Sequence, residues 1–221
     1  MIAKDLISEI VPALRTSDTG TQALQWMDIF KVSHLPIVNN NELLGLISDA
    51  DIYDLNSPDE PIGNHPLSLK KPYVYAEQHI FEVAERVETL KLSVIPVLNK
   101  NKEYVGLITL QDLLQGMSKV TNVEKNGTII VLEMNIRDYS LVEIAQIVES
   151  ENAKIISLYI ASSEDTTKIE VTLKINQDDI ARIIQSFNRY NYIIKNTFSD
   201  ISDIDQFYQD RLDSLFKYLN I

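Results

Sequence analysis

Hydrophobic positions in the first half of the chain follow a helix–strand–strand pattern that occurs twice. Two stretches carry apolar residues at the i, i+3, i+4, i+7 spacing of an amphipathic helix. Their apolar positions are Ala23, Leu24, Met27 and Phe30 in the first stretch, and Ile80, Val83, Ala84, Val87 and Leu90 in the second. Each predicted helix precedes a short apolar strand, a polar turn and a second strand. These strands are expected at 35–38 and 43–47 in the first copy, and at 95–98 and 104–108 in the second.

One motif, Gly-Leu-Ile-[Ser/Thr]-x-x-Asp, ends the second strand of both copies. It covers residues 45–51 in the first copy and 106–112 in the second. Serine and threonine are strong helix N-caps because their side-chain oxygen accepts a hydrogen bond from an unpaired amide of the first turn. A helix is therefore expected to begin at Ser48 and again at Thr109. The recurrence indicates a duplicated supersecondary unit.

The second half of the chain shows a different pattern, strand–helix–strand–strand–helix–strand. Strands are expected at 128–135, 155–161, 168–175 and 192–198, with one helix near 180–187. The other helix follows Ser140, which forms the Ser-x-x-Glu pattern of a capping box with Glu143. This order predicts an antiparallel sheet with both helices on one side.

Proline and glycine positions divide the chain further. All 7 prolines lie at or before Pro96, and those at 58, 61 and 66, together with Gly63, mark a connector between the copies. The last residues carry an apolar stripe at helical spacing that must be buried on the protein or on a second chain. The expected organisation is a first repeat (1–55), a connector (56–71), a second repeat (72–120), a mixed α/β domain (128–199) and a C-terminal amphipathic helix (200–221).

Composition narrows the possible functions. The 221 residues carry a formal net charge of −12, which disfavours binding to a phosphate backbone and argues against a nucleic-acid partner. The chain has no cysteine, so disulfides, a thiolate nucleophile and cysteine–zinc sites are excluded. Charged residues interrupt the N-terminus too early for a secretory signal, and no apolar run is long enough to span a membrane. We expect a soluble, cytoplasmic protein.

The repeated motif also has a chemical interpretation. A hydroxyl at a helix N-terminus, near unpaired amides, favours an anion such as a phosphate. An aspartate one turn further along is suited to a ribose diol, which offers two hydrogen-bond donors. The alternative is that Ser48 with Asp51, and Thr109 with Asp112, simply cap two helices. Two copies in matching context favour a nucleotide site over capping alone.

On these motifs, residues 1–120 resemble a tandem pair of CBS domains, the regulatory modules named after cystathionine β-synthase. The resemblance implies two clefts for adenosine-containing ligands, in which the aspartate contacts ribose and the hydroxyl contacts phosphate. The residues expected to bind are Gly45, Ser48, Asp51 and His34 in one cleft, and Gly106, Thr109 and Asp112 in the other. His34 holds a place that is often basic in nucleotide-binding members, whereas Val94 holds it in the second copy. Asp49 adds negative charge, so AMP or S-adenosylmethionine suits the sequence as well as ATP or better.

The segment 128–199 resembles an ACT domain, a ferredoxin-like βαββαβ module that senses amino acids and pairs its sheets. Amino-acid-binding members usually carry a glycine after the first strand, where this chain reads Arg137-Asp-Tyr-Ser140. We therefore expect a dimerisation module without a ligand. The fold class is α+β, a CBS pair followed by an ACT-like domain and a C-terminal helix. The combination resembles the bacterial acetoin-utilisation regulators.

No phosphate-binding loop, nucleophile elbow or zinc-binding helix motif is present, so we expect a non-catalytic protein. Three scattered histidines also argue against a metal site. The leading hypothesis is a regulatory protein that binds AMP, ADP, ATP or S-adenosylmethionine as an effector, requires no cofactor and forms at least a homodimer. The alternative is a structural interaction module with degenerate, ligand-free clefts that acts through a protein partner.

Overall fold

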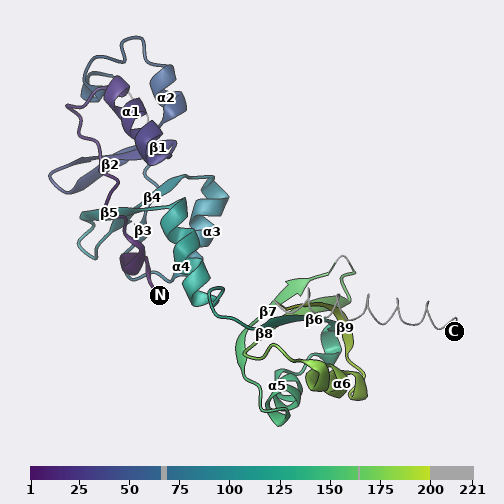
Figure 1. The fold of residues 1–221 in the computed structure, drawn as a ribbon. Helices are drawn as coiled ribbons and strands as arrows, with labels where there is room; N and C mark the ends of the chain where they lie inside the picture. Colours follow the sequence, from purple (N-terminus) through teal and green to yellow (C-terminus); the bar gives the residue numbers. More distant parts are fainter. Residues whose placement is uncertain (66–68, 164, 200–221) are drawn as a thin grey trace, which may run out of the picture. The chain divides into compact units, whose positions relative to one another are not determined.

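The computed structural model describes residues 1–65, 69–163 and 165–199 (Figure 1). The chain divides into two compact units, with the boundary between Val120 and Thr121. The predicted C-terminal helix at 200–221 lies outside the described residues. Within the described ranges, no helix has the length and apolar character needed to cross a membrane.

The first unit contains two copies of one arrangement, a helix followed by a β-hairpin and a second helix. The first copy consists of α1 (Gly20–Phe30), β1 (His34–Asn39), β2 (Glu42–Ser48) and α2 (Asp49–Tyr53), preceded by the 3₁₀ turn η1 (Ala3–Leu6). The second copy consists of β3 (Val74–Tyr75), α3 (Ile80–Leu90), β4 (Val94–Leu98), β5 (Tyr104–Thr109) and α4 (Leu110–Val120), after the turn η2 (Ile62–Asn64). The helices and strands predicted from the periodicity of this half are therefore present.

The two copies use the same local devices at equivalent positions. Thr19 and His79 cap the N-termini of α1 and α3, each accepting a backbone N–H with its side chain. Lys31 and Lys91 end these helices in the left-handed conformation, with φ of 54° and 52°. The hairpins β1–β2 and β4–β5 are antiparallel, and β3 pairs in parallel with β4. The leading strand is shorter in the first copy, where Leu14 makes only an isolated bridge to Ile37.

A single hydrophobic core joins the two copies. Leu35, Ile47, Ile95 and Ile108, from four different strands, are each at most 1% exposed and belong to one packed cluster. Burying side chains of this size contributes roughly 1.5–3 kcal/mol each to folding. The copies therefore form one folding unit with a shared core.

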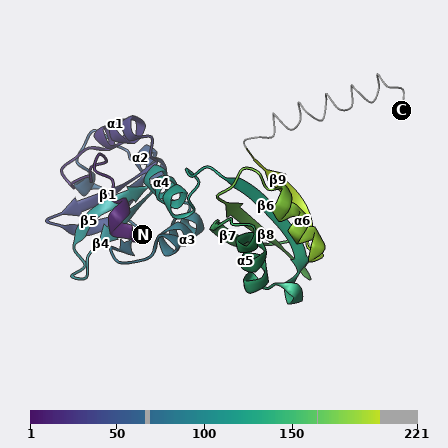
Figure 2. The ribbon, with the colours of Figure 1, turned by 60° about the horizontal axis from the view of Figure 1, so that its bottom comes forward.

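The second unit is a four-stranded antiparallel sheet with two helices. Its elements are β6 (Thr128–Asn135), η3 (Ile136–Asp138), α5 (Leu141–Ser150), β7 (Ile155–Ser162), β8 (Lys168–Ile175), α6 (Ala181–Arg189) and β9 (Ile193–Phe198). The strand order is β7-β8-β6-β9. Both helices cover the same face of the sheet (Figure 2), where Ile144 of α5 and Phe187 of α6 share a fully buried cluster with Leu132 and Leu173.

One local prediction for this unit is only half right. The Ser140 side chain accepts the Glu143 N–H at 3.3 Å, as a helix N-cap should. The reciprocal bond of a capping box is absent from α5, because the Glu143 carboxylate instead accepts the Tyr192 hydroxyl at 2.7 Å. A contact distant in sequence has replaced the local one, since it satisfies the partly buried tyrosine as well as the glutamate.

Candidate functional site

Both copies of the repeated motif form a complete helix cap. In the first, Asp51 Oδ2 accepts the Ser48 N–H at 2.8 Å and the Ser48 hydroxyl at 2.7 Å, while Ser48 Oγ accepts the Asp51 N–H at 3.1 Å. In the second, Asp112 Oδ2 accepts the Thr109 N–H at 3.1 Å and its hydroxyl at 2.6 Å. Only one oxygen of each carboxylate takes part in these bonds. The capping role is therefore real in both copies, and it leaves Oδ1 of each aspartate for another partner.

The first motif faces a cavity of about 470 Å³, within the usual range for small-molecule sites. Its walls come from the first hairpin and α2, from the end of the connector, and from α3 of the other copy. The lining residues are His34, Leu46, Ser48, Asp51, Leu69, Lys70, Lys71, Pro72, Arg86, Leu90 and Leu92. Three of the residues expected to bind, His34, Ser48 and Asp51, thus meet at one cavity. Gly106, Thr109 and Asp112 do not line it.

The motif glycines allow protein segments to approach closely. A Cβ atom at Gly45 would lie 2.4 Å from Leu69 Cβ, and one at Gly106 would lie 2.4 Å from Ile7 Cγ2. Backbone hydrogen bonds hold both segments in place, from Leu46 N–H to the Lys70 carbonyl and from Ser8 N–H to the Leu107 carbonyl. The glycines were expected to contact a ligand, but their close neighbours here are side chains of this chain. Gly45 contributes to the cavity indirectly, because its missing side chain leaves room for the segment that carries Lys70.

His34 lies where the two copies meet. Its Nδ1 atom is 3.1 Å from Ser33 Oγ and 3.0 Å from Ser93 Oγ, and it accepts the Ser93 N–H at 3.4 Å. Ser93 Oγ in turn accepts the Ser33 N–H at 2.9 Å, which ties the copies together. Because a backbone N–H can only donate, Nδ1 must be an acceptor, and the proton of the neutral ring belongs on Nε2.

The charge of His34 follows from its surroundings. Burial lowers the pKa of His34, because the charged imidazolium loses hydration, while Asp49 and Asp51 act in the opposite direction. His34 is therefore a neutral hydrogen-bond donor at physiological pH, and not the cationic group that its place in the motif suggests.

Sequence reasoning missed three cationic residues of this cavity. Lys70 and Lys71 were assigned to the connector, and Arg86 was given no role. Among the described residues, none of the three forms an ion pair within 4.0 Å. No local signal in the sequence marks them, because they reach the cavity only through the packing of the connector and α3.

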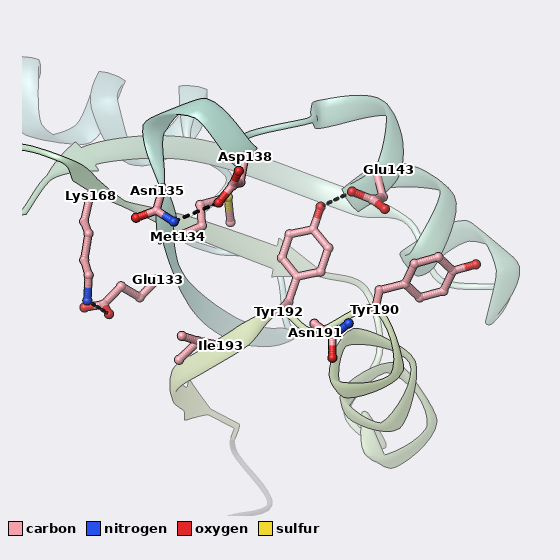
Figure 3. Close-up of a pocket in the computed structure, with 10 residues that line it drawn as sticks. All are labelled: Glu133, Met134, Asn135, Asp138, Glu143, Lys168, Tyr190, Asn191, Tyr192 and Ile193. Atoms are coloured by element: carbon pink, nitrogen blue, oxygen red, sulfur yellow. Dashed lines mark hydrogen bonds and ion pairs between the residues drawn. The ribbon is translucent and has the colours of Figure 1, made fainter.

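The second unit has a smaller cavity, of about 320 Å³, at the end of its sheet (Figure 3). Its lining residues are Glu133, Met134, Asn135, Asp138, Glu143, Lys168, Tyr190, Asn191, Tyr192 and Ile193. Many of its polar groups bind one another, as shown by the dashed lines from Lys168 to Glu133, from Asn135 to Asp138 and from Tyr192 to Glu143. Burial and the bond to Glu143 raise the pKa of Tyr192, so its hydroxyl stays a donor.

The sequence profile of the CBS domain matches the chain twice, over residues 3–57 and 67–119. These matches coincide with the two copies of the first unit and include both Gly-Leu-Ile-[Ser/Thr]-x-x-Asp motifs. The first unit is a CBS-domain pair. The predicted pair is thereby confirmed, and the cavity beside Asp51 is a cleft of that pair.

Relatives with curated descriptions match the CBS region. Inosine-5'-monophosphate dehydrogenase of Methanocaldococcus jannaschii is 26% identical over 121 residues, which cover 51% of this chain and 23% of the enzyme. A CBS domain-containing protein of Dictyostelium discoideum is 27% identical over 135 residues, which cover 54% of this chain and 93% of that protein. The chain thus spans less than a quarter of the length of the dehydrogenase. Most of that enzyme lies outside the matched region.

Solved structures are also similar over about half of the chain. A CBS domain pair/ACT domain protein from Thermotoga maritima has 20% identity and a TM-score of 0.48, covering 54% of this chain and 98% of that one. A CBS domain pair solved with 5'-methylthioadenosine and S-adenosyl-L-methionine has 21% identity and a TM-score of 0.43, covering 54% and 98%.

Proposed function

We propose that this chain is a non-catalytic regulatory protein whose CBS pair binds an adenosine-containing ligand in the cleft beside Asp51. The observation that carries the proposal is the cavity that collects His34, Ser48 and Asp51 from one copy and Arg86 from the other. Asp51 keeps Oδ1 outside its helix cap and can accept the two hydroxyls of a ribose. The Nε2–H of His34 adds a neutral donor, so the cleft offers both an acceptor and donors.

Regulation follows from the way the cleft is built. Its walls come from both copies, which also meet through the hydrogen bonds of Ser33, His34 and Ser93. A ligand that contacts both copies changes the balance between their possible arrangements by its difference in affinity for them. The ligand is therefore an effector, and no bond of the ligand is broken.

The test is calorimetric titration of the full chain with AMP, ADP, ATP and S-adenosylmethionine. Asp51→Ala removes both a helix cap and the acceptor in the cleft, whereas Asp112→Ala removes the equivalent cap outside this cavity. We expect Asp51→Ala to weaken binding by at least about tenfold, as for a lost hydrogen bond to a charged group, and Asp112→Ala to leave it within about twofold of wild type.

Equal affinity in wild type and Asp51→Ala would contradict the assigned ribose contact. Thermal melts give a second readout, since ligand at a hundred times its dissociation constant adds about 2.7 kcal/mol to stability. A melting temperature that no adenosine compound changes would favour the alternative, a ligand-free interaction module.

For residues 128–199 we propose an ACT-like domain that serves self-association and binds no amino acid. Its support is the element order with two helices on one sheet face, and a cavity whose polar groups are largely bonded to one another. Sedimentation of the full chain and of a chain ending at Val120 tests this. We expect the full chain to be the larger oligomer, and equal oligomeric states would contradict the proposal.

A further inference from the structure

The cleft beside Asp51 carries an excess of positive charge. Lys70 and Lys71 lie at the end of the connector, and Arg86 lies on α3, so the three cations come from two separate segments. None has an ion-pair partner within 4.0 Å in the described ranges, while Asp51 is the one acidic residue in the lining. Three unpaired cations around one cavity suit a ligand with several negative charges.

The positions aligned with these three around the second motif have a different character. Ile7 and Leu69 make matching contacts with the motif glycines, which aligns Ser8 with Lys70 and Glu9 with Lys71. The alignment of α1 with α3 places Trp26 at the position of Arg86. In place of three cations, the aligned positions around the second motif therefore hold a hydroxyl, a carboxylate and an indole, all from segments of the first copy.

The same alignment places Val94 at the position of His34. Val94 is fully buried, so it contributes no polar group to a ligand. Beside the second motif, phosphates beyond the first would thus meet Glu9 and Asp112, and none of the aligned positions would supply a cation.

We infer that the cleft beside Asp51 selects an adenine nucleotide with more than one phosphate, through Lys70, Lys71 and Arg86, and that each chain binds one such nucleotide. The inference rests on the proposed function, which needs only an adenosine compound in this cleft. It differs from the expectation, drawn from Asp49, that AMP or S-adenosylmethionine suits the chain as well as ATP or better. Lys70, Lys71 and Arg86 are specificity-determining residues in this assignment, and Asp51 retains the ribose.

The test compares ATP with AMP and S-adenosylmethionine by calorimetry on the full chain. For the wild type we expect one ATP per chain, bound at least about tenfold more tightly than AMP or S-adenosylmethionine. In Lys70→Gln/Lys71→Gln/Arg86→Gln, the preference for ATP over AMP should fall to about twofold or less, with AMP affected least. The control, Lys4→Gln/Lys100→Gln/Lys119→Gln, removes as much charge from exposed positions of the same unit outside the cavity, and it should keep the wild-type preference.

Each other outcome has a definite meaning. Equal affinity for ATP and AMP, two equivalent ATP sites per chain, or an undiminished preference in the cleft variant would overturn this inference and leave the proposed function in place. If the preference for ATP falls equally in the control, the net charge of the unit sets that preference. That outcome would also overturn the assignment to Lys70, Lys71 and Arg86. Absence of binding by every adenosine compound would overturn the proposed function together with this inference.

Discussion

The two CBS copies share a backbone and a motif, yet they present different side chains to the positions around that motif. Both aspartates accept the N–H and hydroxyl of the preceding serine or threonine, and both glycines admit an aliphatic side chain of another segment. Around Asp51 stand Lys70, Lys71 and Arg86, whereas the positions aligned with them around the second motif hold Ser8, Glu9 and Trp26.

This contrast separates two roles of the motif. The helix cap is a local interaction within four residues, so duplication preserves it wherever the motif occurs. The cleft lining also includes side chains from the connector and from the opposite copy, which lie outside the motif. A repeated motif therefore shows where a cleft can form, while segments distant in sequence decide what it binds.

The largest effect is expected from alanine at the two motif glycines. The new Cβ would lie 2.4 Å from Leu69 Cβ at position 45 and 2.4 Å from Ile7 Cγ2 at position 106. Overpacking of this kind costs about 1–3 kcal/mol of unfolding free energy, measurable by urea denaturation. Only Gly45→Ala displaces the segment with Lys70, so only it should also weaken nucleotide binding. Equal loss of binding in Gly106→Ala would show that the copies are not independent.

The next effect concerns the junction between the copies. Ser93→Ala removes the acceptor of the Ser33 N–H and a hydroxyl partner of His34 Nδ1. Leaving a partly buried donor unsatisfied costs about 1–3 kcal/mol. Ser33→Ala removes only one contact to His34 and should cost less in the same denaturation experiment. The reverse order of the two variants would contradict the hydrogen-bond pattern at this junction.

The single tryptophan offers an optical check of the comparison. Trp26 is aligned with Arg86, so it is the equivalent wall residue for the cleft beside Asp112. A nucleotide bound only beside Asp51 should leave Trp26 emission unchanged at saturation, because an adenine ring would quench an indole only on contact. Quenching that follows the calorimetric binding curve would place the nucleotide beside Asp112 instead.

The smallest effect is a pH dependence from His34. Burial lowers the pKa of His34 below its ordinary 6.5, so below that pH the unfolded chain takes up a proton that the folded chain resists. The stability of the wild type should therefore fall as the pH drops through 6.5. His34→Gln lacks this group, and its melting temperature should fall less between pH 7.5 and about 5.5. An identical pH profile for both would contradict the burial effect.

Much of the fold could be predicted from periodicity and caps. The strand at 128–135 and the helices that follow Ser48 and Thr109 occur where the pattern placed them, because short-range preferences decide them. The partner of Glu143 could not be predicted, since Tyr192 is 49 residues away in sequence.

The candidate site divides in the same way. Ser48 and Asp51 were identified from the motif and His34 from the resemblance to CBS domains, and the structure places all three at one cavity. Lys70 reaches that cavity because the end of the connector pairs with β2. Arg86 reaches it because α3 forms one wall of the cavity. Their part in the site depends on tertiary packing, which no local pattern encodes.

The exposure of Lys70, Lys71 and Arg86 has an evolutionary consequence. Exposed side chains add little to folding stability, so mutation can exchange them without endangering the protein. A gene of this kind can therefore acquire a new effector through a few surface codons, while the buried strands and capped helices continue unchanged.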